Sequence, residues 1–151
     1  NLGRKDPTTS DSDVLSRRWL PVDLDPVRPS GVSSTDKEHA AALAHAERIR
    51  TWLGEQGFPD PVMADSGNGA HLLYRIDLPN NDESRDLVKR CLEVLASVFN
   101  DTAAQVDVGN FNAARIWKLY GTVSRKGDAT AVDPTGGPGS SLSPKNQVSC
   151  R

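Results

Sequence analysis

The chain has few of the features that mark a membrane protein, a disulfide framework or a protein that coats nucleic acid. No apolar run approaches the ~20 residues that a membrane span needs. Its two cysteines, Cys91 and Cys150, form no C-x-x-C pair, which argues against a zinc site. Its formal net charge is −2, so it lacks the positive excess of a non-specific nucleic-acid coat. We therefore expect a cytoplasmic protein that contacts no membrane, and an enzyme that touches nucleic acid locally remains open.

The length and composition predict one folded domain followed by a tail. A chain of 151 residues is long enough to bury a real core, and we place this domain at residues 1–132. Residues 133–151 are rich in Gly, Ser and Pro and hold too little apolar surface to pack. The sequence therefore predicts a linker or disordered tail there.

Hydrophobic periodicity predicts six elements in an α+β order. Two capping boxes, Thr35 with Glu38 and Asn80 with Glu83, mark the starts of two helices. In chain order we expect a strand at 19–26, a helix from Thr35 to about Gly57, strands at 61–65 and 70–78, a helix over 80–99 and a strand at 103–108. This β-α-β-β-α-β order is that of the RRM-like, or ferredoxin-like, split βαβ fold. In that fold the first and third strands are central and the fourth flanks the first.

The first strand, in "WLPVDLDP", carries two aspartates one residue apart. Alternate residues of a strand share a face, so Asp23 and Asp25 lie together while Val22 and Leu24 face the core. Neighbouring carboxylates repel unless a positive charge lies between them, and Mg²⁺ or Mn²⁺ prefers such oxygen ligands. Asp107, on the flanking strand, would complete a site for two divalent ions of the kind that phosphoryl transfer uses. The alternative is a strand end with solvated charges.

Two further segments supply candidate ligands for an anion. In "DSGNGAH" a tight glycine turn can aim backbone N–H groups at a phosphate, and His71 can donate to a triphosphate oxygen. The alternative is an ordinary hairpin turn followed by a structural histidine. "ARIWKLYGTVSRKG" supplies cations that suit a polyphosphate or a template backbone, or else form a solvated basic edge: Arg115, Lys118, Arg125 and Lys126.

Five other side chains are given mainly structural interpretations. Arg28 can reach a phosphate, but a surface position is favoured. Trp117 and Tyr120 can stack on a base, but core packing is favoured. His39 and His45 lie on the first helix, where we expect solvated surface residues without a role.

Taken in order, "VDLD", "SGNGAH", "VD" at 106–107 and "NAARIWKLYGTVSRKG" resemble the archaeo-eukaryotic primase superfamily. The likeness is to the primase-polymerase domains of phages, plasmids and bacterial mobile elements, and it covers about residues 17–128. It implies an RRM-like catalytic core to which further N-terminal elements usually belong, so residues 1–132 would be a partial core.

The resemblance also implies roles for the matching positions. Asp23, Asp25 and Asp107 would bind two ions of Mg²⁺ or Mn²⁺. The nucleotide-binding residues would be Ser66, Gly67, Gly69, His71, Arg115, Lys118 and Lys126. The implied reaction is attack of a 3′-hydroxyl on the α-phosphate of an NTP or dNTP, directed by a single-stranded DNA template. A replicative helicase region or protein is the implied partner.

Two other functions stay open on the sequence alone. One is a non-catalytic RRM-like module that binds nucleic acid, although such modules use aromatic residues on the central strands. Here those positions hold Asp23 and Asp25, and Tyr74 is the only aromatic residue in the third strand. The other is a metal-dependent phosphohydrolase that uses the same carboxylates.

Overall fold

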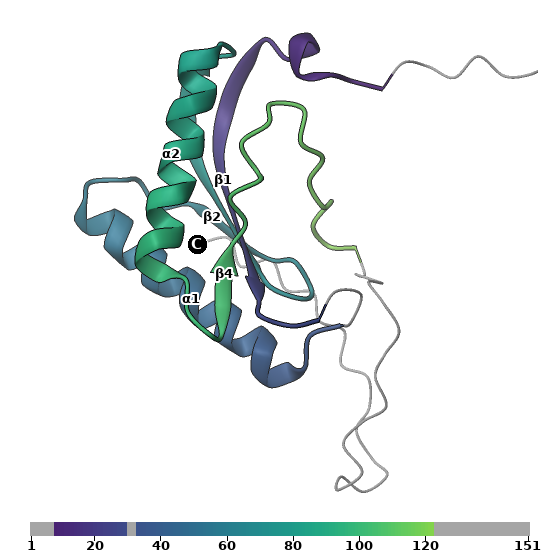
Figure 1. Cartoon of the computed structure of the whole chain (residues 1–151), viewed down its shortest axis with the longest axis vertical. Helices are drawn as coiled ribbons and strands as arrows, with labels where there is room; N and C mark the ends of the chain where they lie inside the picture. Colours follow the sequence, from purple (N-terminus) through teal and green to yellow (C-terminus); the bar gives the residue numbers. More distant parts are fainter. Residues whose placement is uncertain (1–7, 30–32, 123–151) are drawn as a thin grey trace, which may run out of the picture.

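The computed structural model describes residues 8–29 and 33–122, which form a four-stranded antiparallel sheet and two helices (Figure 1). The predicted α+β class is therefore confirmed. Arg125, Lys126 and the tail predicted at 133–151 lie outside the described residues.

The sheet has the strand order predicted from the sequence. Its strands are β1 (Ser16–Pro26), β2 (Val62–Asp65), β3 (Ala70–Pro79) and β4 (Ala104–Val106). They lie in the order β2-β3-β1-β4, so the first and third strands are central and the fourth flanks the first. In the long β1–β3 ladder Asp23 faces His71 across the strands.

Helix α1 (Asp36–Glu55) and helix α2 (Asp82–Phe99) begin at different kinds of cap. Thr35 forms the predicted capping box with Glu38. The box predicted for Asn80 and Glu83 is wrong, because Asn81 is the N-cap and its side chain accepts from the Ser84 N–H at 2.9 Å. Asn80 instead donates to two backbone carbonyls of the N-terminal segment, so the second of two adjacent asparagines starts the helix.

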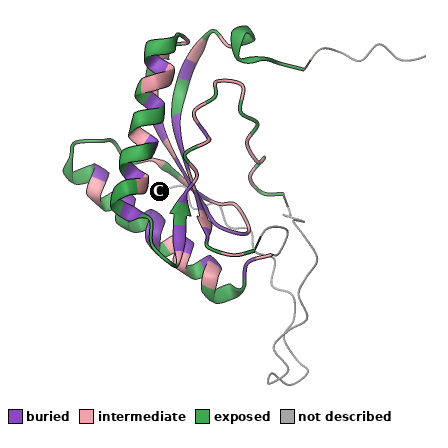
Figure 2. Ribbon diagram, viewed as in Figure 1, coloured by how far each residue is buried: buried purple, intermediate pink, exposed green. Residues whose placement is uncertain are grey.

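Both helices cover one side of the sheet, and the segment that follows β4 runs along the other side (Figure 1). The core lies between helices and sheet, where Val22 and Leu24 of β1 are fully buried (Figure 2). Their side chains alternate with those of Asp23 and Asp25, which point to the opposite, open face of the sheet. The predicted alternation along the first strand is therefore confirmed.

The two histidines of α1 are buried, so their predicted place on the solvated surface is wrong. His39 is only 8% exposed and His45 only 5%. The Nε2 atom of His39 lies 2.8 Å from Oδ1 of Asp65, and Nε2 of His45 donates to the Phe99 carbonyl at 3.0 Å. Both fall on the inner stripe of α1, where hydrogen bonds compensate for their burial.

The last strand is shorter than the predicted 103–108. The Asp107 N–H still donates to the Asp23 carbonyl at 2.9 Å, which extends the β1–β4 pairing by one bond. The Asp107 carboxylate then accepts from the Gly109 N–H at 2.8 Å. This turn, made by an aspartate side chain on its own backbone, ends the strand and leads the chain onto the open face.

No helix within residues 8–29 and 33–122 has the length and apolar character to cross a bilayer.

Candidate active site on the open face of the sheet

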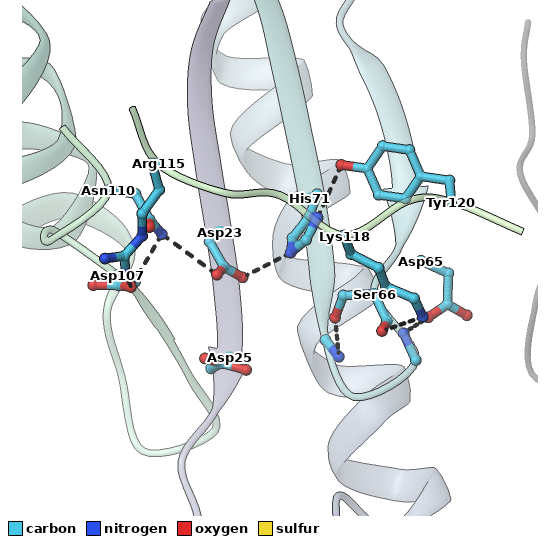
Figure 3. Close-up of polar contacts among 12 residues, drawn as sticks. Asp23, Asp25, Asp65, Ser66, His71, Asp107, Asn110, Arg115, Lys118 and Tyr120 are labelled. Carbon is cyan, nitrogen blue, oxygen red and sulfur yellow. Dashed lines mark hydrogen bonds and ion pairs between the residues drawn. The ribbon is translucent and has the colours of Figure 1, made fainter. Parts of the chain in front are cut away.

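Strand β1 delivers two carboxylates to the open face (Figure 3). The side chain of Asp23 is 22% exposed and that of Asp25 is 45% exposed. The guanidinium of Arg28 lies 3.7 Å from Asp25 and its side chain is only 11% exposed. The interpretation of Arg28 as a surface residue is therefore wrong, because its side chain folds back toward the end of β1.

Asn110 joins the carboxylate of β1 to the one that follows β4. Its Nδ2 donates to Oδ2 of Asp107 at 3.0 Å and approaches Oδ2 of Asp23 at 3.4 Å. Arg115 brings a positive charge to the same place, with Nη2 3.4 Å from Oδ2 of Asp107. The structure thus brings Asp23 and Asp107 together, linked by the Asn110 amide, with the Arg115 guanidinium beside Asp107.

His71 stands beside Asp23 at the start of β3. Its Nε2 lies 3.2 Å from Oδ1 of Asp23, and its Nδ1 is 2.9 Å from the Tyr120 hydroxyl. The ring of Trp117 meets the imidazole edge to face, with centroids 4.7 Å apart. Core packing was the favoured interpretation of Trp117 and Tyr120, and it is wrong. Both residues lie over the open face against His71.

The Tyr120 hydroxyl keeps its proton throughout the ordinary pH range. Burial, and to a lesser degree the negative charge of Asp23, raise the pKa of Tyr120 to about 12. The hydroxyl beside His71 is therefore neutral and able to donate a hydrogen bond at neutral pH.

The glycine turn between β2 and β3 is held by its own side chains. The Gly67 N–H donates to Oδ1 of Asp65 at 2.6 Å, and the Gly69 N–H donates to Oγ of Ser66 at 2.9 Å. These two N–H groups, which the sequence offered as phosphate ligands, thus already have acceptors inside the turn. The Ser66 hydroxyl, which accepts one of them, can still donate to a ligand.

Gly69 is required by a close approach to β1. A Cβ atom at this position would lie 2.1 Å from the carbonyl oxygen of Leu24. Any larger residue would push the turn away from β1 and from the carboxylates beside it. The glycine therefore sets the distance between two parts of the site.

Lys118 connects the segment after β4 to this turn, since its Nζ donates to the Ser66 carbonyl at 2.8 Å. Together these groups surround a cavity of about 430 Å³. Its lining contains both signs of charge beside apolar surface: Asp23, Asp25, Ser66, Asn68, His71, Asn110, Arg115, Ile116, Trp117 and Lys118. This volume falls within the range of small-molecule sites.

The side chains of the cavity have the right chemistry for a divalent ion, but they are too far apart to hold one in this structure. Asp23 and Asp25 supply the carboxylate oxygens that Mg²⁺ and Mn²⁺ prefer. Within the described ranges, however, no three His, Cys, Asp or Glu side chains are grouped closely enough to hold one metal ion. Asp107 is held by Asn110 and Arg115, so it can turn to a cation only when these contacts open.

Sequence reasoning missed two buried asparagines of the site. Asn110 bridges the carboxylates, and Asn68 accepts from both the backbone N–H and the hydroxyl of Ser34. Asn68 lies in "DSGNGAH", which was interpreted from the sequence only as a glycine turn. For Asn110 the available signal was its position three residues after Asp107, where a side chain can fold back onto the carboxylate.

Comparisons with protein-family models, with curated proteins and with solved structures yield no match to this chain.

Proposed function

We propose that residues 1–132 form an RRM-like catalytic core of the archaeo-eukaryotic primase type, a DNA primase-polymerase that acts in the cytoplasm. It would use single-stranded DNA as template and an NTP or dNTP as substrate, beside a replicative helicase region or protein. One observation carries the proposal. Asp23, Asp25 and His71 line one cavity on the open sheet face, and Asn110 ties Asp107 to Asp23.

The arrangement of the segments supports this function. The motifs of the resemblance start on three different strands or turns that are far apart in the sequence. The order β2-β3-β1-β4 places them on neighbouring strands. The fourth motif, residues 112–127, of which the structure describes 112–122, supplies Arg115, Trp117 and Lys118 to the same cavity.

Two divalent ions would be held by Asp23, Asp25 and Asp107, and they would supply charge neutralisation at the transferred phosphate and at the attacking 3′-hydroxyl. The chain's own part is to place the substrate. His71, Lys118 and the Ser66 hydroxyl face the cavity from one side and Arg115 from the other, as donors for triphosphate oxygens. Lys126 lies beyond the described residues and stays a prediction.

A bound polyphosphate also gives Arg115 a stronger partner than it has now. Its contact with Asp107 is a long one, and both side chains are partly exposed, so it contributes little stability. When Arg115 turns to the substrate, it leaves Oδ2 of Asp107, and this oxygen becomes available to a cation once the Asn110 contact also opens. Substrate and metal would therefore bind cooperatively.

One observation favours the non-catalytic nucleic-acid-binding module as a second candidate. Trp19 lies on the same face of β1 as Asp23 and is 42% exposed, with the Arg75 guanidinium 5.5 Å from the centre of its ring. An exposed aromatic ring with a cation beside it suits a stacked base and its phosphate. The carboxylates that follow on this face would repel the same backbone, which is why we place this candidate second.

The test is template-dependent synthesis. The protein is given a single-stranded DNA template, labelled NTPs or dNTPs, and Mg²⁺ or Mn²⁺, with and without a primer. We expect Asp25→Asn and Asp107→Asn to lower synthesis by roughly a hundredfold or more, because each removes a ligand of the divalent ions that would neutralise the charge developing in the reaction. Asp77→Asn, at an exposed position of β3, is the matched control and should leave synthesis unchanged.

The outcomes separate the candidates. Products that need a template and are lost in both site variants support the polymerase, and products without a primer make it a primase. Without products, Mn²⁺-dependent binding of dNTP that both variants lose supports an intact nucleotide site. Release of inorganic phosphate without a template indicates a phosphohydrolase. Template binding that needs no metal and survives in Asp25→Asn would instead establish the binding module.

A further inference from the structure

Tyr120, His71 and Asp23 form a chain of contacts across the candidate site (Figure 3). From it we infer that Tyr120 is a positioning residue, whose hydroxyl holds the His71 ring so that its Nε2–H faces the cavity. The inference rests on the proposed function in one respect, since there this N–H meets the triphosphate.

The two ends of the chain assign the protons of the ring. An ionised carboxylate only accepts hydrogen bonds, so the nitrogen that faces Asp23 at 3.2 Å, Nε2, is the one that carries the proton. In the neutral ring Nδ1 is then an acceptor. The Tyr120 hydroxyl, 2.9 Å away, is placed to donate to it. The raised pKa of Tyr120 means that this donor keeps its proton.

Packing alone cannot choose this orientation. The edge-to-face contact with Trp117 fixes the plane of the imidazole. A half-turn of the ring about its Cβ–Cγ bond keeps that plane and changes the contact little, but it puts a carbon in place of each nitrogen. The hydroxyl of Tyr120 distinguishes the two orientations, because only a nitrogen at the Nδ1 position accepts its hydrogen bond.

Tyr120 becomes more important when substrate enters. Asp23 is contacted by Asn110 as well as by His71, and in the proposed reaction it gives up contacts to hold a cation. Tyr120 then remains as the partner that keeps the proton on Nε2. Lys118 lies two residues before Tyr120, and its contact with the Ser66 carbonyl holds in place the segment that carries the Tyr120 hydroxyl.

The test compares the only two tyrosines of the sequence. Tyr120→Phe removes the hydroxyl at His71. Tyr74→Phe is the matched control, because the Tyr74 hydroxyl is buried on the other face of the sheet and finds no hydrogen-bond partner within the described structure. Long-range ¹H–¹⁵N NMR of the ligand-free protein reports the tautomer of His71. Mn²⁺-dependent synthesis reports KM for dNTP and kcat separately.

We expect Tyr120→Phe to move both ring-nitrogen resonances of His71 toward an average of the tautomers. Loss of one hydrogen bond should raise KM for dNTP roughly three- to tenfold, with a smaller change in kcat. Tyr74→Phe should leave the resonances and KM unchanged. Should Tyr120→Phe lower the thermal midpoint, fluorination of Tyr120 next to its hydroxyl keeps the ring and strengthens the donor. The Nδ1 resonance should then shift in the opposite sense.

The two readouts keep the inference and the proposed function apart. Unchanged ring-nitrogen resonances in Tyr120→Phe overturn the inference, whatever happens to synthesis. If the resonances change while the wild-type protein neither binds nor incorporates nucleotide, Tyr120 still positions His71 and the proposed function is wrong. A change in the resonances together with a raised KM supports both.

Discussion

The two faces of β1 differ although their residues alternate along one strand. Val22 and Leu24 are fully buried against the helices, while Asp23 and Asp25 face a polar cavity on the other side. The helix-covered face is held by close apolar packing. The open face is held by a few directional contacts, such as those of Asn110 with Asp23 and Asp107.

This difference indicates how one short strand can serve stability and chemistry at once. Packing on the helix-covered face fixes the backbone of β1, and the backbone in turn fixes where the carboxylates point. The open face can then keep side chains whose charges would not stabilise a fold by themselves. Substitutions on the two faces should therefore have separable effects.

The largest effect on stability should come from Leu24→Ala, compared with Asp25→Asn beside it. Leu24 is fully buried, so its truncation should lower the free energy of unfolding by about 2–5 kcal/mol. Asp25→Asn should change it by less than about 1 kcal/mol, while metal-dependent nucleotide binding is lost. Urea unfolding and nucleotide titration measure the two. A loss of several kcal/mol in Asp25→Asn would contradict the separation of the faces.

Gly69→Ala tests the close approach of the glycine turn to β1. Its Cβ would meet the Leu24 carbonyl, so we expect a loss of about 3 kcal/mol, measured by thermal or urea unfolding. Gly54→Ala is the control, because a Cβ in that turn of α1 has no heavy atom within 4 Å. An alanine inside a helix should stabilise the protein by about 0.5–1 kcal/mol. Equal stability of the two variants would mean that the turn can move away from β1 freely.

The tyrosine of the helix-covered face should make the protein sensitive to alkali. Burial raises the pKa of Tyr74 to about 12, against about 10 in an unfolded chain. The folded state thus holds this proton more tightly. The resulting stability is complete below about pH 10 and is lost as the pH rises toward 12, by roughly 2–3 kcal/mol.

The Tyr74→Phe variant checks this sign. At pH 7 it should be as stable as the wild type or slightly more stable, because the hydroxyl that it removes has no partner in the described part of the chain. Between pH 10 and 12 its free energy of unfolding should fall less than that of the wild type. Urea unfolding at each pH measures this free energy. An equal fall in both proteins would show that Tyr74 does not contribute.

The smallest effect concerns the amide bridge of the open face. Asn110→Asp places a third carboxylate against Asp23 and Asp107 and should cost about 1–2 kcal/mol at neutral pH. Mn²⁺ should restore the lost stability, and differential scanning calorimetry with and without the ion will measure this effect. Asn81→Asp, at the N-cap of α2, should be neutral because both residues cap well. Destabilisation that Mn²⁺ leaves unchanged would count against a cation site between these carboxylates.

Local patterns predicted most of the fold. Alternation around Asp23 and Asp25 indicated the strand and its two faces, and Thr35 with Glu38 marked the start of α1. The burial of His39 and His45 was not predictable in this way. A histidine can be buried on the inner stripe of a helix only if hydrogen-bond acceptors lie beside it. Here the acceptors are Asp65 and the Phe99 carbonyl, which are far from the two histidines in the sequence.

The parts of the candidate site that the strand order brings together could be predicted from the sequence. The parts that depend on side chains of the irregular segment folding back onto the sheet could not. The order of the strands was enough to bring Asp23 close to His71. The bridge of Asn110 and the hydroxyl of Tyr120 depend on the path of residues 109–122, which has no regular periodicity. The return of this irregular segment to the sheet is visible only in the folded structure.

The path of that segment is tied down at one point by Arg17, whose Nη1 donates to the Phe111 carbonyl at 2.6 Å across 94 residues of sequence. An arginine that binds a main-chain oxygen places no demand on the side chain at position 111. Arg17 and residue 111 should therefore vary independently among related sequences. Maps of covarying positions would then leave out one of the contacts that hold this segment over the site.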